Sequence, residues 1–98
     1  EQLKNAAAFT GENIWQLPTC EEYKDLLKSE IADLKNSGGP FAGAITAGLF
    51  LKEFVQDKPW LHIDIAGTAF VDKETGIFPF GATGSGVRLL TTLLKYME

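Results

Sequence analysis

Residues 41–56 form a segment that is apolar on nearly every side of a helix, and this segment constrains the fold more than any other. Its small residues recur at spacings of four, so one side of the helix would be flat enough for another chain segment to lie very close. They are Gly43, Ala44, Ala47 and Gly48. Because glycines weaken an isolated helix, tertiary packing must hold this one in place. We therefore predict a buried helix over residues 41–56.

A strand is predicted next, over residues 60–66, directly after Pro59. Leu61, Ile63 and Ile65 would share one face of it, and His62 and Asp64 the other. Helices around such a strand are typical of an α/β layer. One strand cannot form a sheet alone, so we expect its partner strands to lie outside this sequence.

Helices are also predicted at both ends of the chain. Residues 1–9 read as the end of a helix that stops at Thr10 and Gly11. The apolar spacing near the other end predicts an amphipathic helix over residues 86–97, capped by Ser85 or Thr83.

The segment "TCEE" indicates the start of another helix. Its spacing is that of a capping box, with Thr19 as N-cap and Glu22 three residues later. Helical spacing of apolar residues would carry this helix as far as Leu34, before the breakers Gly38 to Pro40.

Composition and charge disfavour several classes of function. The formal net charge is −4 without a basic stripe, so binding to a nucleic-acid backbone has no electrostatic support. The single cysteine, Cys20, excludes an internal disulfide, fits a reducing compartment and reads as structural. The longest apolar run, residues 40–51, is shorter than the roughly 20 residues of a membrane span.

The chain begins on Glu1 in what reads as mid-helix, so we expect a piece of a longer protein.

His62 and Asp64 are the first candidates for chemistry. Zinc needs three or four converging ligands, and no third ligand stands at a recognisable spacing from this pair. A general acid or base would also need a nucleophile or metal that the sequence does not place. A structural histidine on a strand is the favoured interpretation.

The glycine-rich segment Gly81 to Gly86 is the second candidate. A glycine-rich turn that enters a helix can bind phosphate through its backbone N–H groups. The segment lacks both the Walker lysine and the full dinucleotide fingerprint, so a plain helix entry is favoured. Arg88 could bind an anion there, although such a residue more often pairs with a surface carboxylate.

The third candidate is "AGTA", Ala66 to Ala69, just past the predicted strand. Ligands of open α/β sheets gather beyond the carboxyl ends of the strands, and small residues leave room for a substrate side chain. Ordinary tight packing explains the same residues equally well.

Three stretches taken together resemble the C-terminal end of the leucyl aminopeptidase family, the cytosolic two-metal metallo-exopeptidases. They are "DLKNSGGPFAGAITAGLFLKEFV", "PWLHIDIAGTAF" and "GATGSGVRLLTTLL", and "NIWQLP" is similar to the family's Trp-x-Leu/Met-Pro entry to this region. The resemblance runs from about residue 13 to the end. It implies the C-terminal part of an α/β/α sandwich with a mixed central sheet, in a cytoplasmic homohexamer that removes N-terminal residues such as leucine from peptides.

The resemblance also implies how the chemistry is divided. The family uses two divalent metal ions, manganese or zinc, held by lysine, aspartates and glutamate around an Asn-Thr-Asp-Ala-Glu-Gly-Arg motif that these 98 residues lack. We therefore expect residues 1–98 to be an incomplete portion of the catalytic domain, with no catalytic or metal-binding residue and no metal bound by this chain alone. Ala66 and Ala69 match positions that line the pocket for the substrate's N-terminal side chain, and Ser37 matches a wall of the pocket beyond the scissile bond.

Several residues depart from the family's pattern. Ser37 stands where an apolar residue is common, Phe80 where a basic residue is common, and Ala69 where animal relatives have methionine. The smaller Ala69 would widen the first pocket. The resemblance also ends the predicted helix near Lys28, giving a helix over residues 20–28 and a strand over residues 32–36.

The function expected is a C-terminal segment of a metal-dependent aminopeptidase that supplies pocket wall and core packing and is inactive alone. Its partners would be peptide substrates, the remainder of the catalytic domain and further copies of the protein, without a membrane. The alternatives are a non-catalytic interaction or DNA-associated module of the same fold, which the acidic charge disfavours, and a nucleotide-binding fragment that uses residues 81–86.

Overall fold

The computed structural model describes residues 1–97, and the chain divides into two compact units. The terminal unit combines Glu1–Trp15 with the chain from Asp64 on, and the central unit is Gln16–Ile63. The elements are α1 (Gln2–Thr10), a 3₁₀ helix η1 (Glu21–Leu27), α2 (Gly43–Lys52), β1 (Phe70–Val71), β2 (Gly81–Ala82) and α3 (Val87–Met97). No helix in residues 1–97 is long and apolar enough to cross a membrane.

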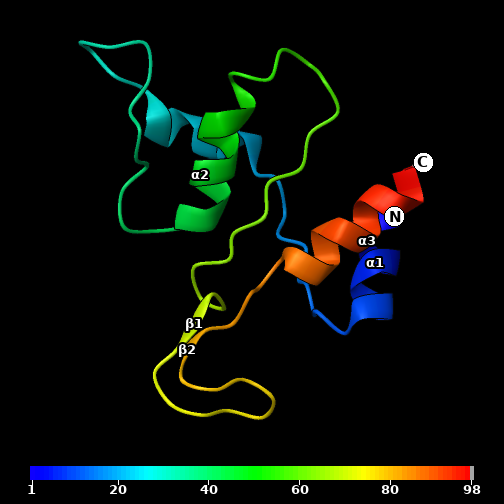
Figure 1. Ribbon diagram of the computed structural model, residues 1–98. Helices are drawn as coiled ribbons and strands as arrows, with labels where there is room; N and C mark the ends of the chain where they lie inside the picture. The colour runs from blue at the N-terminus through cyan, green and yellow to red at the C-terminus, as the bar shows by residue number, and fades with distance from the viewer. Residues whose placement is uncertain (98) are drawn as a thin grey trace. The chain divides into compact units, whose positions relative to one another are not determined.

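In the terminal unit, α1 and α3 lie side by side (Figure 1). Their contact buries Ala6 and Ala7 of α1 and Leu89 and Leu93 of α3. Alanines on one helix leave room for leucines on the other, so the two backbones approach closely. Both helices were predicted, and α1 ends where expected, at Gly11 in the left-handed conformation with φ 71°.

The same unit holds a small antiparallel ladder, labelled β1 and β2 in Figure 1. Phe70 pairs with Ala82 and Val71 pairs with Gly81. The rings of Phe70 and Phe80 meet edge to face with centroids 5.6 Å apart. Helices together with this ladder are consistent with an α/β fold.

The central unit is built on the packing of η1 against α2. Leu27 of η1 is 1% exposed and Leu49 of α2 is 2% exposed, so these two side chains form its core. The chain after η1 folds back, and the Lys35 N–H donates to the Leu27 carbonyl at 2.8 Å.

The helix predicted over residues 20–28 is present over Glu21–Leu27, but it is a 3₁₀ helix. Its flanking bonds span three residues, as in the Tyr23 N–H that donates to the Cys20 carbonyl at 2.9 Å. The predicted capping box is wrong, because Cys20 is the N-cap and makes no side-chain cap bond. Since the helix starts one residue late, Thr19 and Glu22 no longer hold the N-cap and N3 positions.

The predicted strands over residues 32–36 and 60–66 are not formed within the described residues. Neither segment pairs with another, and the sheet found within residues 1–97 is the ladder of β1 and β2. The physical reason is the one noted from the sequence: a strand needs a neighbour to satisfy its backbone N–H and C=O groups. The mixed central sheet is therefore not formed by the described residues alone.

The buried helix predicted over residues 41–56 is shorter, Gly43–Lys52. Ala42 at its start has φ 53°, and Gln56 and Asp57 after its end have φ 52° and 60°. These values lie outside the right-handed helical region, so the helix cannot include those residues.

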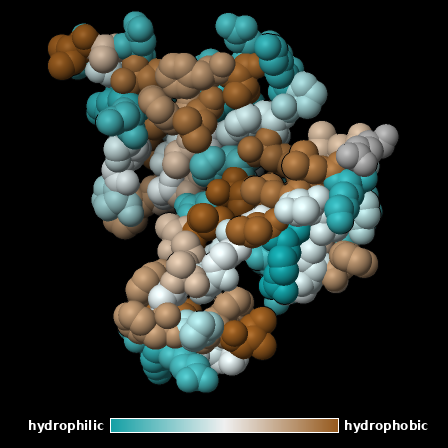
Figure 2. All heavy atoms as spheres, in the orientation of Figure 1, coloured by the Kyte–Doolittle hydropathy of each residue, from teal (hydrophilic) through white to brown (hydrophobic). Residues whose placement is uncertain are grey.

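Burial of α2 is also less complete than predicted. Thr46, Gly48 and Leu49 are buried, whereas Leu51 is 45% exposed. Hydrophobic residues elsewhere are exposed as well, Phe9, Trp15 and Ile31 among them, and Figure 2 shows brown hydrophobic residues over much of the visible face. An apolar surface of this extent is typical of a region that other protein covers.

Candidate functional site

The turn Ile65–Ala69 is the best-defined candidate site in the terminal unit. The N–H groups of Thr68 and Ala69 both donate to the Ile65 carbonyl at 2.9 Å. Asp64 Oδ1 accepts the Ala66 N–H at 2.9 Å, which fixes the entry to the turn. Ala66 is exposed and Ala69 is half-buried. The turn therefore presents small side chains on a backbone held by its own hydrogen bonds.

The glycine-rich segment after β2 lies beside this turn. The Thr83 N–H donates to the Ala69 carbonyl at 3.0 Å. The hydroxyls of Thr83 and Ser85 both donate to the Thr68 carbonyl, the second at 3.1 Å. The second and third candidate segments of the sequence are thus parts of one arrangement.

The N-terminus of α3 is capped by Glu12, which lies near the start of the sequence. Glu12 Oε1 accepts the Gly86 N–H at 3.0 Å and Glu12 Oε2 accepts the Leu89 N–H at 2.6 Å. A carboxylate at this position is favoured by the helix dipole and by the free N–H groups. The predicted caps, Ser85 and Thr83, are wrong, because their hydroxyls donate to Thr68 instead.

This contact also bears on the phosphate hypothesis for residues 81–86. A phosphate at the start of α3 would need the N–H groups of Gly86 and Leu89, which the Glu12 carboxylate occupies. The segment is therefore a helix entry. Arg88 in the first turn of α3 is exposed. Sequence reasoning missed Glu12, since 74 residues separate it from Gly86 and no local pattern links them.

His62 and Asp64 each have structural partners. The imidazole of His62 stacks on Trp60, with ring centroids 6.0 Å apart and planes at 22°. A Cβ built on Gly48 of α2 would lie 3.4 Å from His62 Cδ2, so the glycine leaves room for the imidazole. Asp64 caps the turn through Ala66. Within residues 1–97, no group of three or more His, Cys, Asp or Glu side chains could hold a metal ion.

The predicted pocket residues fall in different units. Ala66 and Ala69 belong to one turn of the terminal unit. Ser37 belongs to the central unit, where it is exposed and its Oγ accepts the Gly39 N–H at 3.4 Å. Cys20, also in the central unit, is a half-buried free thiol.

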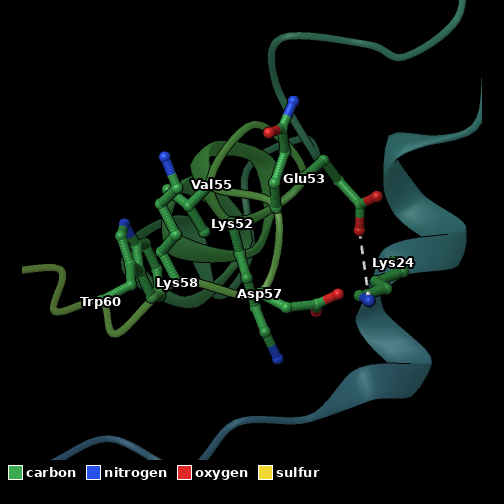
Figure 3. A pocket seen from close by; sticks show the side chains of 8 residues that line it. Lys24, Lys52, Glu53, Val55, Asp57, Lys58 and Trp60 are labelled. Atoms are coloured by element: carbon green, nitrogen blue, oxygen red, sulfur yellow. Dashed lines mark ion pairs between the residues drawn. The ribbon is translucent and has the colours of Figure 1, made fainter.

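A pocket of about 520 Å³ lies in the central unit, beside the end of α2 (Figure 3). Lys24 Nζ, on its wall, lies 3.2 Å from Glu53 Oε1 and 2.8 Å from Glu21 Oε2, and Lys52 Nζ lies 2.9 Å from Glu21 Oε1. Hydrogen bonds from Lys24, which has the larger effect, and from Lys52 lower the pKa of Glu21 to about 2. The bond to Glu21 in turn raises the pKa of Lys24. The carboxylates neutralise these two ammonium groups, which weakens the pocket as an anion site.

The chain is similar to known proteins in sequence and in structure. The profile of the cytosol aminopeptidase family, catalytic domain, matches residues 1–91. The probable cytosol aminopeptidase of Alkaliphilus metalliredigens (strain QYMF) is 57% identical over 98 residues, which are 100% of this chain and 20% of the relative. That of Clostridium perfringens (strain 13 / Type A) is 58% identical over 92 residues, 94% of this chain and 19% of the relative.

Solved structures agree with the sequence matches. The cytosol aminopeptidase from Coxiella burnetii is 39% identical with a TM-score of 0.85, over 97% of this chain and 21% of that one. The bottromycin maturation enzyme BotP in complex with Mn is 34% identical with a TM-score of 0.91, over 98% of this chain and 22% of that one. The chain thus spans about a fifth of the length of these relatives. By sequence and structure, the chain belongs to the cytosol aminopeptidase family.

Proposed function

We propose that the chain is part of a metal-dependent aminopeptidase and forms a wall of the pocket for the substrate's N-terminal side chain. The observation that carries this proposal is the turn Ile65–Ala69. It presents the small side chains of Ala66 and Ala69 while its backbone is bound to Asp64, Thr83 and Ser85. A pocket wall needs this combination of free volume and fixed backbone, because specificity depends on the size of the space left for the side chain.

The metal ions of the proposed enzyme do not fit the residues of this chain. The BotP structure is described as a complex with Mn, and the resemblance implies two divalent ions, manganese or zinc. A site for such an ion needs several converging donors, and the part of the chain described, residues 1–97, has no cluster of three. The ligands in this proposal come from the remainder of the catalytic domain, and residues of this chain bind and orient the peptide.

The remainder of the domain also has a structural role in the proposal. Segments 32–36 and 60–66 would pair with its strands and complete the mixed sheet of an α/β/α sandwich. Its side chains would cover exposed apolar residues such as Phe41 and Ile77, which are 81% and 78% exposed. The complete protein would be a cytoplasmic homohexamer, as the resemblance implies.

The width of the pocket follows from Ala69. Its methyl group leaves space that the methionine of animal relatives would fill. The pocket should therefore accept N-terminal residues larger than leucine as well as leucine, in place of a strict leucine preference. Ser37 is proposed to line the pocket beyond the scissile bond.

The test compares the 98-residue chain with the longer protein that contains it. Each is assayed for hydrolysis of a leucyl anilide with and without manganese, after circular dichroism has shown that the sample is folded. We expect metal-dependent turnover by the longer protein alone. Absence of turnover by the longer protein would refute the aminopeptidase proposal. Turnover by the chain that is lost in His62→Ala or Asp64→Ala would show that this pair is catalytic.

A further inference from the structure

Glu12 begins a series of hydrogen bonds that ends at the candidate pocket wall. Its carboxylate accepts the N–H groups of Gly86 and Leu89 and so fixes the start of α3. Ser85, immediately before Gly86, donates its hydroxyl to the Thr68 carbonyl. Thr68 lies inside the turn that carries Ala66 and Ala69. Each step is a direct bond or a covalent neighbour.

Glu12 is itself well placed to act as the fixed end of this series. It follows Gly11, the left-handed residue that ends α1, and its N–H donates to Thr10 Oγ1 at 3.3 Å. Its side chain is half-buried, and both carboxylate oxygens are used. A bidentate charged acceptor holds two N–H groups in one geometry more strongly than a neutral acceptor does.

We infer that Glu12 is a positioning residue for substrate selection: through the start of α3 and Ser85 it sets the place of the turn Ile65–Ala69. The inference rests on the proposed function, because it assigns the turn to the substrate pocket. Glu12 does not touch the substrate. It acts through the Thr68 carbonyl, to which Thr83 also donates its hydroxyl.

The decisive variant is Glu12→Gln in the longer protein. Glutamine keeps the size of the side chain but has a single acceptor oxygen and no charge, so one of the two N–H bonds is lost. We expect amide exchange of peptides that cover residues 65–69 and 81–86 to accelerate about tenfold, the factor for one charge-assisted hydrogen bond. The ratio of kcat/KM for phenylalanyl over alanyl anilide should shift by a similar factor, mainly through KM.

Two further variants separate positioning from general destabilisation. Ser85→Ala removes one hydroxyl from the series and should reproduce both changes to a smaller extent. Leu93→Ala opens a cavity in the buried contact of α3 with α1, where Leu93 is 7% exposed. It should lower the melting temperature. The phenylalanyl-to-alanyl ratio of kcat/KM should stay within about twofold of the wild-type ratio, as expected when two sites are independent.

The outcomes are distinct. A shifted ratio with faster exchange at residues 65–69 in Glu12→Gln and Ser85→Ala, but an unchanged ratio in Leu93→Ala, supports the inference. An unchanged ratio in Glu12→Gln, or an equal shift in Leu93→Ala, overturns it. If the wild-type protein hydrolyses no anilide, the proposed function fails. The exchange measurement then decides the structural claim alone, and unchanged exchange at residues 65–69 in Glu12→Gln refutes it.

Discussion

Gly38 lies so close to Thr46 of α2 that a Cβ built on the glycine would be 2.8 Å from Thr46 Cγ2. Thr46 is 3% exposed, and its hydroxyl donates to the Gly43 carbonyl at 3.2 Å, so its side chain has little freedom to move. The chain before α2 therefore packs against the helix at Gly38, where a larger residue would not fit.

Gly38→Ala should destabilise the central unit by about 1–3 kcal/mol, the usual cost of an overpacked contact. The matched control is Gly43→Ala in the first turn of α2, where a Cβ meets nothing within 4 Å. That control should be neutral or stabilising by up to about 1 kcal/mol, since alanine is the better helix former. Urea unfolding of both variants measures the difference, and equal stability of the two would contradict the close contact.

The sequence predicted those elements whose signals are local. Amphipathic spacing located α3, and the left-handed Gly11 ended α1 where the sequence placed the stop. The predicted strands 32–36 and 60–66 depend on partner strands, which we expect to lie outside this sequence, and neither strand forms in the described residues. A strand pattern indicates that a segment favours the extended conformation, but a strand forms only where a neighbouring segment pairs with it.

The candidate site was predictable in part for the same reason. Small residues after a strand pattern pointed to Ala66 and Ala69, and glycines pointed to residues 81–86. The bonds that join these segments, from Thr83 and Ser85 to Thr68, are long-range, as is the cap by Glu12. Likewise, α2 is shorter than its apolar pattern: Ala42 before it has a positive φ, and beyond Lys52 the backbone bonds span three residues, as in the Phe54 N–H that donates to the Leu51 carbonyl at 3.1 Å.

The ion pairs of Glu21 should persist below pH 4.5, where an ordinary glutamate would already be protonated. Lys24 and Lys52 lower its pKa from the ordinary 4.5 to about 2. Because the folded pKa is lower, the pairing stabilises the central unit above pH 4.5, and that contribution is lost as the pH falls from 4.5 to 2. An NMR titration of the side-chain carboxyl should show a midpoint for Glu21 well below 4.5.

Salt provides the control for this titration. The groups are exposed, so 1 M salt should move the midpoint of Glu21 back toward 4.5. Lys24→Met should move it in the same direction by removing the first of its two cations. A Glu21 midpoint that stays near 4.5 in the wild type at low salt would mean that the ion pairs do not form in solution.

Exposed apolar residues should make the 98-residue chain associate. Ile31 is 99% exposed, Trp15 88% and Phe41 81%. Water-exposed surface of this kind promotes contact between copies. Light scattering after size exclusion should give a mass that rises with concentration, together with binding of the dye ANS. A monomer at all concentrations without dye binding would contradict the claim that other protein covers this surface.

The most direct test of the pocket-wall proposal is Ala69→Met in the longer protein, with kcat/KM measured for alanyl, leucyl and phenylalanyl anilides. The control is Ala8→Met, the same change at an exposed position of α1. A narrower pocket predicts that the phenylalanyl-to-alanyl ratio falls by about tenfold or more in Ala69→Met and is unchanged in Ala8→Met. An Ala69→Met enzyme with wild-type ratios for all three substrates would show that the turn Ile65–Ala69 does not line the pocket.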